Sequence, residues 1–330
     1  MNRALVVTTI NPPNVALRQM AQASAQHNVR FIVVGDTKSP VNFHLIGSEF
    51  LDIAAQGAAF PEFAAELPTR HYARKNIGYL LAIRDGAEAI QETDDDNIPR
   101  PEFWTPPSDI IQVDRARSEN AWLNIYALFT DKKIWPRGFP LECVANGREP
   151  SIVSGTTSRG LIVQGLADDN PDVDAVYRLL FPLPIRFNVR KPVLLGQGTW
   201  CPFNSQNTTF RSQAFPLLYL PSHCSFRMTD IWRSFIAQRC LWELDEGLVF
   251  TSPTVVQERN EHSLLRDLED EVPGYLRNDV LRRILEDCPL RPGDTMANLV
   301  KCYEALCAQS FFKSEELTLV QLWVRQLERF

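Results

Sequence analysis

The hydrophobic positions of residues 1–100 alternate between short apolar runs and segments with helical spacing. Residues 4–9 form a β-branched apolar run typical of a buried parallel strand, and Val15–Gln26 follows with helical spacing. We expect the other elements of this part to be a strand at 30–34, a short strand and a helix within 43–67, a helix at 76–84 that Gly86 closes, and a strand that runs into Asp94. Such alternation predicts a doubly wound α/β sheet, which binds ligands beyond the carboxyl ends of its strands.

The remaining chain has a turn-rich middle and a helical end. Residues 101–225 are rich in Pro and Trp, with strand-and-turn pieces at 134–140 and 160–165. An amphipathic helix is expected at 228–244 and a strand at 248–256. From Asp267 onward the pattern predicts helices at 279–287, 294–310 and 314–328, the first after a turn at Pro273-Gly274. These helices carry apolar stripes, so we expect them to pack on the core or on a second copy in a homodimer.

Three groups of polar residues fall at one edge of the predicted sheet. They are Thr8, Thr9 and Asn11 after the first strand, Asp36 after the second, and the triplet Asp94–Asp96 after the third. Adjacent carboxylates repel one another unless a cation lies between them, and oxygen ligands suit Mg²⁺ or Mn²⁺. An acidic triplet alone is more often a solvated turn. Its coincidence with the other two groups favours a site for a nucleoside diphosphate.

The phosphates of such a ligand need positive charge. The sequence has no G-x-G-x-x-G and no G-K-[ST] loop, so neither a dinucleotide site nor a P-loop is indicated. Metal and basic side chains must neutralise the phosphates instead, and Arg70, Arg74 and Lys75, just before the third helix, are the candidates. A solvated basic helix start explains these three residues equally well.

Composition narrows the class of protein. The 330 residues carry a net charge of −6 and no basic block, which gives a nucleic-acid partner no electrostatic support. The apolar runs are too short for a transmembrane segment, and the N-terminus lacks the features of a signal peptide. Seven scattered cysteines form no C-x-x-C pair, which fits reduced thiols in a cytoplasmic protein.

Three further segments carry candidate chemistry, each with a structural alternative. Asp230 stands at the start of the helix at 228–244, where Thr229 or Asp230 is the expected N-cap; the same carboxylate is a general base if the helix start faces a pocket. Residues 196–209 suit either a substrate-lining loop or a plain connection. The acidic cluster at 168–174 fits an exposed loop better than a second metal site.

Several blocks together resemble the STELLO glycosyltransferase family. They are the string YLPSHCSFRMTDIWRSFIAQRCLWELDEGLVFTSPTVVQ at 219–257, Trp135–Pro140, Gln164–Leu166, Asp172–Arg178 and Arg74–Tyr79. More distantly, the acidic triplet, the G-T-x-x-P loop at 198–202 and the D-x-W at 230–232 are similar to the reversibly glycosylated polypeptides, the UDP-arabinopyranose mutases of plants. The resemblance covers roughly residues 70–260.

The resemblance implies a GT-A-like, Rossmann-like glycosyltransferase fold with a mixed central sheet. Residues 1–265 would be the catalytic domain, with a nucleotide-binding half at 1–100 and an acceptor half at 101–265, and 266–330 a C-terminal helical extension. Asp94 and Asp96 would take the outer positions of a D-x-D motif on metal and diphosphate. Asp230 would match the acidic residue placed near the acceptor, where inverting members use a base.

Two departures from the family pattern stand out. Where relatives are expected to have a metal-binding histidine in a pattern such as T-V-H, this chain has Thr254–Gln257, and a Gln amide oxygen is a weaker ligand. His262 lies nearby without the matching spacing. The plant members are anchored in the Golgi membrane, and no such segment occurs here, so a cytoplasmic catalytic domain is expected.

The leading hypothesis is a Mn²⁺- or Mg²⁺-assisted transfer of a sugar from a nucleotide-sugar donor, most simply a UDP-sugar, to a hydroxyl of a glycan or other acceptor. Asp94–Asp96 would hold metal and diphosphate, and Asp230 would be the base. The alternatives are a UDP-sugar mutase, a nucleotidyltransferase and a non-catalytic scaffold. A nucleotidyltransferase needs a triphosphate loop that residues 9–14 do not supply.

Overall fold

One mixed sheet runs through the centre of the protein. The computed structural model describes residues 1–145, 150–258 and 263–330. Within these ranges the sheet has 11 strands in the order β3-β2-β1-β4-β10-β8-β11-β9-β6-β7, with β5 paired to β11. The strands are β1 Arg3–Thr8, β2 Val29–Val34, β3 Glu49–Leu51, β4 Ala89–Thr93, β5 Asn97–Pro99, β6 Ile111–Arg117, β7 Ser151–Ser158, β8 Ile162–Asp168, β9 Val193–Leu195, β10 Asn207–Arg211 and β11 Val249–Gln257. The expected α/β class with a mixed central sheet is confirmed.

Several helices lie close to the expected positions, but the helix expected at 279–287 already begins at Leu264, and two short helices lie within 43–67, where one is expected. The α-helices are α1 Val15–Gln26, α2 Ile53–Ala59, α3 Pro61–Glu66, α4 Lys75–Arg84, α5 Leu141–Ala145, α6 Ala175–Leu180, α7 Thr229–Trp242, α8 Leu264–Asp287, α9 Thr295–Ala308 and α10 Ser314–Leu327. Single 3₁₀ turns precede two of them, η1 Tyr72–Arg74 before α4 and η5 Phe226–Met228 before α7.

The direction of the strands changes at β4. The strands β3, β2, β1 and β4 are parallel, so their carboxyl ends share one edge, whereas β10 is antiparallel to β4. Beyond β10, β8 and β11 again run parallel to each other. The three polar groups expected at strand ends therefore lie on one edge. The strand β1 has β2 on one side and β4 on the other, so the order of strands reverses there, and open α/β sheets bind ligands at such a point.

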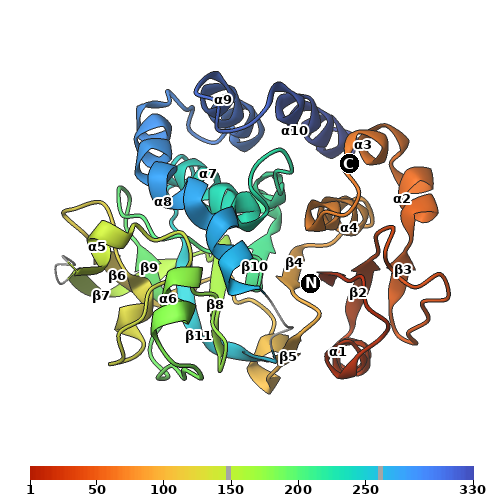
Figure 1. Ribbon diagram of the computed structural model, residues 1–330, viewed down its shortest axis with the longest axis horizontal. Helices are drawn as coiled ribbons and strands as arrows, with labels where there is room; N and C mark the ends of the chain where they lie inside the picture. The colour runs from red at the N-terminus through yellow and green to blue at the C-terminus, as the bar shows by residue number, and fades with distance from the viewer. Residues whose placement is uncertain (146–149, 259–262) are drawn as a thin grey trace.

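Helices cover the two faces of the sheet unequally. Figure 1 shows α4, α7, α9 and α10 on one face and α1 on the other. Alternate residues of β1 divide accordingly, because successive side chains of a strand point to opposite faces. Val6 belongs to the larger core beneath α4 and α7, whereas Leu5 and Val7 belong to the smaller core beneath α1.

The expected turn at Pro273-Gly274 is wrong, because α8 continues through both residues. Proline lacks an N–H and clashes with the preceding turn, so a helix interior tolerates it only where packing compensates. Gly274 lies against Met228, close enough that a Cβ would collide with its sulfur. Nearby, Asn278 accepts a hydrogen bond from Trp232 at 2.9 Å and donates one to the Gly138 carbonyl at 2.7 Å. Tertiary contacts therefore hold α8 continuous where its own sequence favours a break.

The C-terminal helices share the main core with the sheet. Trp323 and Tyr303, both fully buried, belong to the same core as Val6 of β1. Glu316, at the start of α10, accepts hydrogen bonds from Tyr219 and from the backbone N–H groups of Ser222 and His223. Residues after 265 thus pack on the core, which is one of the two expected positions, the other being the surface of a second copy.

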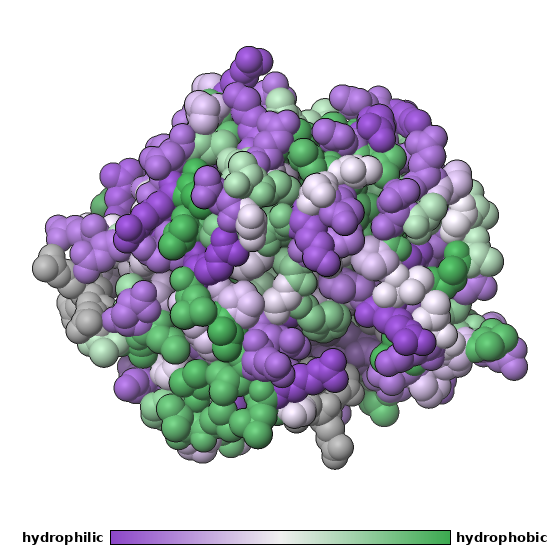
Figure 2. Space-filling model, turned by 45° about the horizontal axis from the view of Figure 1, so that its top comes forward, coloured by the Kyte–Doolittle hydropathy of each residue, from purple (hydrophilic) through white to green (hydrophobic). Residues whose placement is uncertain are grey.

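The surface of the helical face is mostly hydrophilic, and hydrophobic side chains gather at its lower left in Figure 2. Exposed apolar side chains on α6 and α8 include Leu179, Leu180, Leu265 and Leu276. Within the described ranges, every helix falls short of the length and apolar character that crossing a bilayer requires.

Candidate active site

Two joined cavities lie beyond the carboxyl ends of the parallel strands. The first, which we call the loop cavity, has a volume of about 520 Å³ and lies over the ends of β1 and β2. The second, which we call the triplet cavity, has a volume of about 250 Å³ and lies between Asp94–Asp96 and the start of α7. The walls of both include Thr8, Tyr72, Asp95 and Phe226. A ligand with two parts could therefore extend from one cavity into the other.

The predicted site residues come together at these cavities, with one exception. Lys75 lines neither cavity, because its side chain is fully buried beneath the triplet. The residues that line the loop cavity are Thr8, Thr9, Asn11, Asp36, Arg74 and Asp95, and those that line the triplet cavity are Thr8, Asp94, Asp95, Asp96 and Asp230.

Asp36 ties the second strand end to the segment before α4. One carboxylate oxygen accepts the N–H of Thr37 at 2.6 Å and the other accepts the N–H of His71 at 3.0 Å. The Ser39 hydroxyl accepts the N–H of Asp36 and donates to the carbonyl of Thr9, which joins the first two loops. The floor of the loop cavity is therefore fixed by hydrogen bonds between the Asp36 and Ser39 side chains and the backbone.

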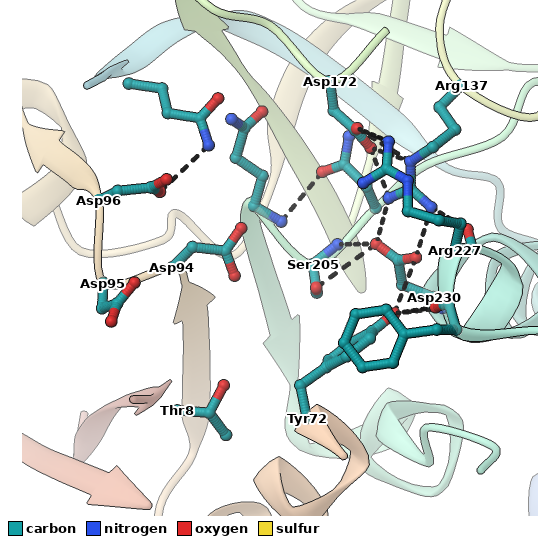
Figure 3. Close-up of a pocket in the computed structure, with 14 residues that line it drawn as sticks. Thr8, Tyr72, Asp94, Asp95, Asp96, Arg137, Asp172, Ser205, Arg227 and Asp230 are labelled. Atoms are coloured by element: carbon teal, nitrogen blue, oxygen red, sulfur yellow. Dashed lines mark hydrogen bonds and ion pairs between the residues drawn. The ribbon is translucent and has the colours of Figure 1, made fainter. Parts of the chain in front are cut away.

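Asp95 joins the triplet to the first loop. Its carboxylate accepts the Thr9 hydroxyl at 2.5 Å and the Asn11 amide at 3.2 Å, and its carbonyl accepts the Asn14 side chain at 2.7 Å. In Figure 3 its side chain points away from those of Asp94 and Asp96. The sheet edge thus separates the three adjacent carboxylates, with one turned towards the loop cavity.

Asp94 lines the triplet cavity with its side chain 40% exposed. Desolvation raises the pKa of Asp94 to about 7, the Lys75 ammonium opposes that rise, and the carboxylates of Asp96, Asp230 and Asp95 add to it. Lys75 pairs with Asp94 at 3.4 Å and donates to the Thr93 carbonyl at 3.1 Å. The lining of the cavity includes five carboxylates against Arg137 and Arg227, and Lys75 beneath it adds a third positive charge. Formal negative charge is therefore in excess, and the cavity favours a further cation.

Asp96 faces the same cavity beside Gln257, the residue at the position where relatives are expected to carry a histidine. The Gln257 amide donates to Asp96 at 3.1 Å, and the Gln257 oxygen is buried with no hydrogen-bond partner among the described residues. His262 lies outside the described residues. The described part of the chain contains no cluster of three or more His, Cys, Asp or Glu that could hold a metal.

The solvated helix start expected as the alternative for Arg74 and Lys75 is wrong, because both side chains are buried. Arg74 donates to Gln56 at 2.6 Å and to the Leu67 carbonyl at 2.8 Å, and burial lowers its pKa. Among the described residues it forms no ion pair, so its charge remains available at the wall of the loop cavity. Arg70, by contrast, is an exposed residue of that wall.

The N-cap expected at Thr229 or Asp230 is also wrong. Met228 occupies the N-cap of α7, and Asp230 lies in the first turn with its side chain buried and directed into the triplet cavity (Figure 3). Its two oxygens accept hydrogen bonds from Tyr72 at 3.1 Å, from two nitrogens of Arg137 at 3.0 and 2.9 Å, and from Ser205. Burial alone would raise the pKa of Asp230, but the Arg137 guanidinium holds it well below its ordinary value.

Arg137 is the main site residue that the sequence did not single out. It lies in the block Trp135–Pro140, which entered only through the family resemblance. Its guanidinium bridges Asp230 and Asp172, donating to Asp172 at 2.7 to 3.1 Å. The expectation of an exposed acidic loop at 168–174 is wrong, because Asp168, Asp172 and Asp174 are all buried.

The polar loop at 196–209 lines the triplet cavity, as one of its two interpretations expected. Asn204, Ser205 and Gln206 belong to its wall. On the other side, Tyr72 and Phe226 meet edge to face with ring centroids 4.9 Å apart. Phe226 is 45% exposed. The cavity therefore combines amide and hydroxyl groups with an aromatic rim, which suits a sugar.

Comparison with known proteins confirms the expected resemblance. Residues 227–330 match the family model described as STELLO glycosyltransferases. The chain is 31% identical over 270 residues to the protein named probable glycosyltransferase STELLO2 from Arabidopsis thaliana, covering 76% of this chain and 35% of that protein. It is 30% identical over 269 residues to probable glycosyltransferase STELLO1 of the same plant, covering 76% of this chain and 34% of that protein. The chain thus spans about a third of the length of these relatives.

The extent of these matches revises the boundaries of the resemblance. The family model reaches residue 330, so it includes the α8–α10 region, whereas the sequence blocks ended near residue 260. It begins at Arg227, just before Asp230, and therefore leaves the acidic triplet outside. The more distant similarity to the reversibly glycosylated polypeptides stays a prediction.

Proposed function

We propose that this protein, whose C-terminal third matches the STELLO glycosyltransferases, transfers a sugar from a nucleotide-sugar donor to a hydroxyl acceptor. The observation that carries the proposal is the position of the acidic triplet: Asp94 and Asp96 line the triplet cavity, and Asp95 between them lines both cavities. A donor of this kind has a nucleoside, a diphosphate and a sugar in sequence. The loop cavity would take the nucleoside, the triplet the diphosphate, and the triplet cavity the sugar.

A divalent cation, Mn²⁺ or Mg²⁺, fits the triplet through Asp94 and Asp96. Mg²⁺ in phosphate-binding sites uses one or two carboxylates and completes its shell with phosphate oxygens and water, so two acids suffice. The raised pKa of Asp94 and the unpartnered oxygen of Gln257 both support this assignment. When bound, the ion would supply positive charge to the departing diphosphate. Lys75 would hold Asp94 in place, and Arg74 would add charge from the loop cavity.

Asp230 is proposed as the carboxylate that meets the acceptor hydroxyl and, in a single displacement, takes its proton. A carboxylate with so low a pKa is a weak base. Each hydrogen bond donated to the Asp230 carboxylate weakens it further as a base. The acceptor hydroxyl would therefore have to displace Tyr72 or Ser205 and donate to that Asp230 oxygen itself. Arg137 would keep the carboxylate ionised and fixed in direction throughout.

A UDP-sugar mutase remains a second candidate, because one observation favours it. The donors Tyr72, Arg137 and Ser205 leave Asp230 poorly placed to accept a proton, and rearrangement of a sugar ring at the same donor site needs no acceptor hydroxyl. The two functions separate in one assay. Incubation with UDP-sugars in the absence of acceptor gives an isomerised UDP-sugar from a mutase and none from a transferase.

The test of the main proposal is a thermal-shift panel of UDP, GDP, ADP and CDP with and without Mn²⁺. We expect one nucleotide, UDP in the simplest case, to raise the melting temperature most, and Mn²⁺ to increase that rise. Asp96→Ala should abolish the part that depends on Mn²⁺, because it removes one of the two proposed ligands. Asp131→Ala, at an exposed position, serves as the control. An unchanged metal response in Asp96→Ala would contradict the site.

The homodimer through the C-terminal helices and the cytoplasmic location stay predictions. Analytical ultracentrifugation tests the first directly. The acceptor would be a glycan or another hydroxyl compound.

A further inference from the structure

A chain of buried charges connects the C-terminal helices with the triplet cavity. It begins at Glu271 of α8, which is 1% exposed and lines neither cavity. Both Nε and Nη2 of Arg227 donate to one Glu271 oxygen, at 3.0 and 2.8 Å. The other Glu271 oxygen accepts the Ala175 N–H at 2.8 Å and the Tyr275 hydroxyl at 2.6 Å. These four hydrogen bonds fix the direction of the Glu271 carboxylate.

Arg227 continues the chain to Arg137. The Arg227 carbonyl accepts a hydrogen bond from Arg137. The Nη2 atom of Arg227 lies 3.9 Å from Asp172, the acid that also pairs with Arg137. Arg137 has five N–H donors, one on Nε and two on each terminal nitrogen. Asp172, Asp230 and the Arg227 carbonyl together engage all three nitrogens. Arg137 therefore has no donor left for a ligand.

Arg227 differs from Arg137 in this respect. Its Nε and Nη2 are held by Glu271, whereas its Nη1 has no partner among the described residues. Arg227 lines the triplet cavity with a side chain that is 12% exposed (Figure 3). The ion pair with Glu271 thus fixes one edge of the guanidinium and leaves the other edge free to donate.

Charge decides which group this free edge can bind. Arg227 and Arg137 are accompanied by three acids, Glu271, Asp172 and Asp230, so the cluster has a formal charge of −1 (two positive and three negative groups). An anion gains little there, whereas a neutral hydroxyl gains a charge-assisted hydrogen bond. A sugar hydroxyl is the ligand group that the surroundings fit.

We propose that Glu271 is a positioning residue that aims Arg227 at a hydroxyl of the donor sugar in the triplet cavity. The inference rests on the proposed function, because it requires a nucleotide sugar whose sugar part enters this cavity. It makes α8 part of the site without any contact between α8 and the ligand. Removing the Glu271 charge releases the guanidinium and weakens binding of the sugar part alone.

Isothermal titration calorimetry in the presence of Mn²⁺ tests this with UDP and with UDP-glucose, UDP-galactose, UDP-xylose and UDP-arabinopyranose. The quantity of interest is the ratio of the dissociation constant of UDP to that of the tightest UDP-sugar. In Glu271→Gln we expect that ratio to fall by about tenfold, the size of one charge-assisted hydrogen bond. The dissociation constant of UDP should change by less than about twofold, because UDP does not reach Arg227.

Two further variants separate positioning from folding. Glu269→Gln, on the same helix at an exposed position, should leave the ratio unchanged. In an Arg227→Met background, Glu271→Gln should have no additional effect on the ratio, since the residue through which it acts is gone. An unchanged ratio in Glu271→Gln, or the same effect of that substitution with and without Arg227, would overturn the proposal.

The test also distinguishes this proposal from the proposed function. If the unaltered protein binds neither UDP nor any UDP-sugar, the proposed function fails. If it binds UDP and binds every UDP-sugar no more tightly, the donor site stands and the assignment of the sugar to Arg227 is overturned.

Discussion

At the scale of single residues, the polar groups around the two cavities are held by partners from distant parts of the chain. The Asp230 carboxylate accepts hydrogen bonds from Tyr72 and Arg137, which are 158 and 93 positions away in the sequence. The Asp36 carboxylate accepts a hydrogen bond from the backbone N–H of His71, 35 positions away. Such contacts determine protonation states that the sequence does not show, because burial and neighbouring charge can shift the pKa of a group by several units from its ordinary value.

His71 gives a prediction for stability against pH. Burial is the main cause that lowers the pKa of His71 to about 4, and His223 adds to it while Asp36 opposes it. The unfolded chain, with an ordinary value near 6.5, then binds more protons than the folded chain between pH 4 and 6.5. The free energy of unfolding therefore decreases as pH falls through that window, by up to about 3 kcal/mol.

Urea unfolding at pH 4.5 and 7 checks the sign of this effect. His71→Gln should lose most of the decrease, because Gln does not titrate. His44→Gln, at an exposed position, is the matched control and should behave as the unaltered protein does. Equal decreases in all three proteins would show that His71 is not responsible.

At the scale of secondary-structure elements, α4 packs on the sheet through a glycine. A Cβ at Gly78 would lie 2.6 Å from a methyl of Val6 and 2.7 Å from a methyl of Val34, both on stiff β-branched side chains. The close approach brings the start of α4, with Lys75, beneath the triplet. The site thus depends on a helix that packs against β1 and β2 too closely for a side chain at position 78.

Gly78→Ala should destabilise the protein by about 1–3 kcal/mol, although Ala favours a helix by about 1 kcal/mol over Gly. The overpacking outweighs the propensity because the methyl groups cannot rotate away. Gly57→Ala in α2, where a Cβ would meet nothing within 4 Å, is the control and should stabilise by about 0.5–1 kcal/mol. Chemical denaturation of both variants measures the difference, and a stabilised Gly78→Ala would contradict the packing argument.

At the scale of the whole molecule, the C-terminal helices and the sheet form one core. Trp323 of α10 is fully buried, donates to the Pro216 carbonyl at 3.1 Å and packs against Tyr219 and Phe63. Phe63 belongs to α3, in the first fifth of the sequence. A core that includes residues from both ends of the chain is expected to unfold as a unit.

Trp323→Ala should therefore lower the stability of the entire protein by about 3–5 kcal/mol rather than release α10 alone. Tryptophan fluorescence and far-ultraviolet circular dichroism should report one shared transition at a lower urea concentration. Leu276→Ala, where the side chain is 74% exposed, should leave the midpoint nearly unchanged. Two separate transitions in Trp323→Ala would indicate an independent helical domain.

The sequence by itself determined the parallel half of the sheet and the place of the ligand site. Short β-branched runs such as residues 4–9 and helix-spaced segments such as Val15–Gln26 are local patterns, and each matched an observed element within about two residues. Because parallel strands end at a common edge, those patterns also placed Thr8–Asn11, Asp36 and Asp94–Asp96 together. The pattern of the turn-rich middle predicted few elements, because strands β6, β7 and β9 form through pairing with strands distant in the sequence.

Only the tertiary structure decided which charges face a ligand and which are engaged within the protein. Arg74, Lys75 and Asp230 looked alike in sequence as exposed polar groups at helix starts, and all three are buried. Arg137 and Glu271 gave no local signal of a role at the site. Their positions follow from contacts between residues far apart in the chain, and an ion pair depends on distance in space rather than on separation in sequence.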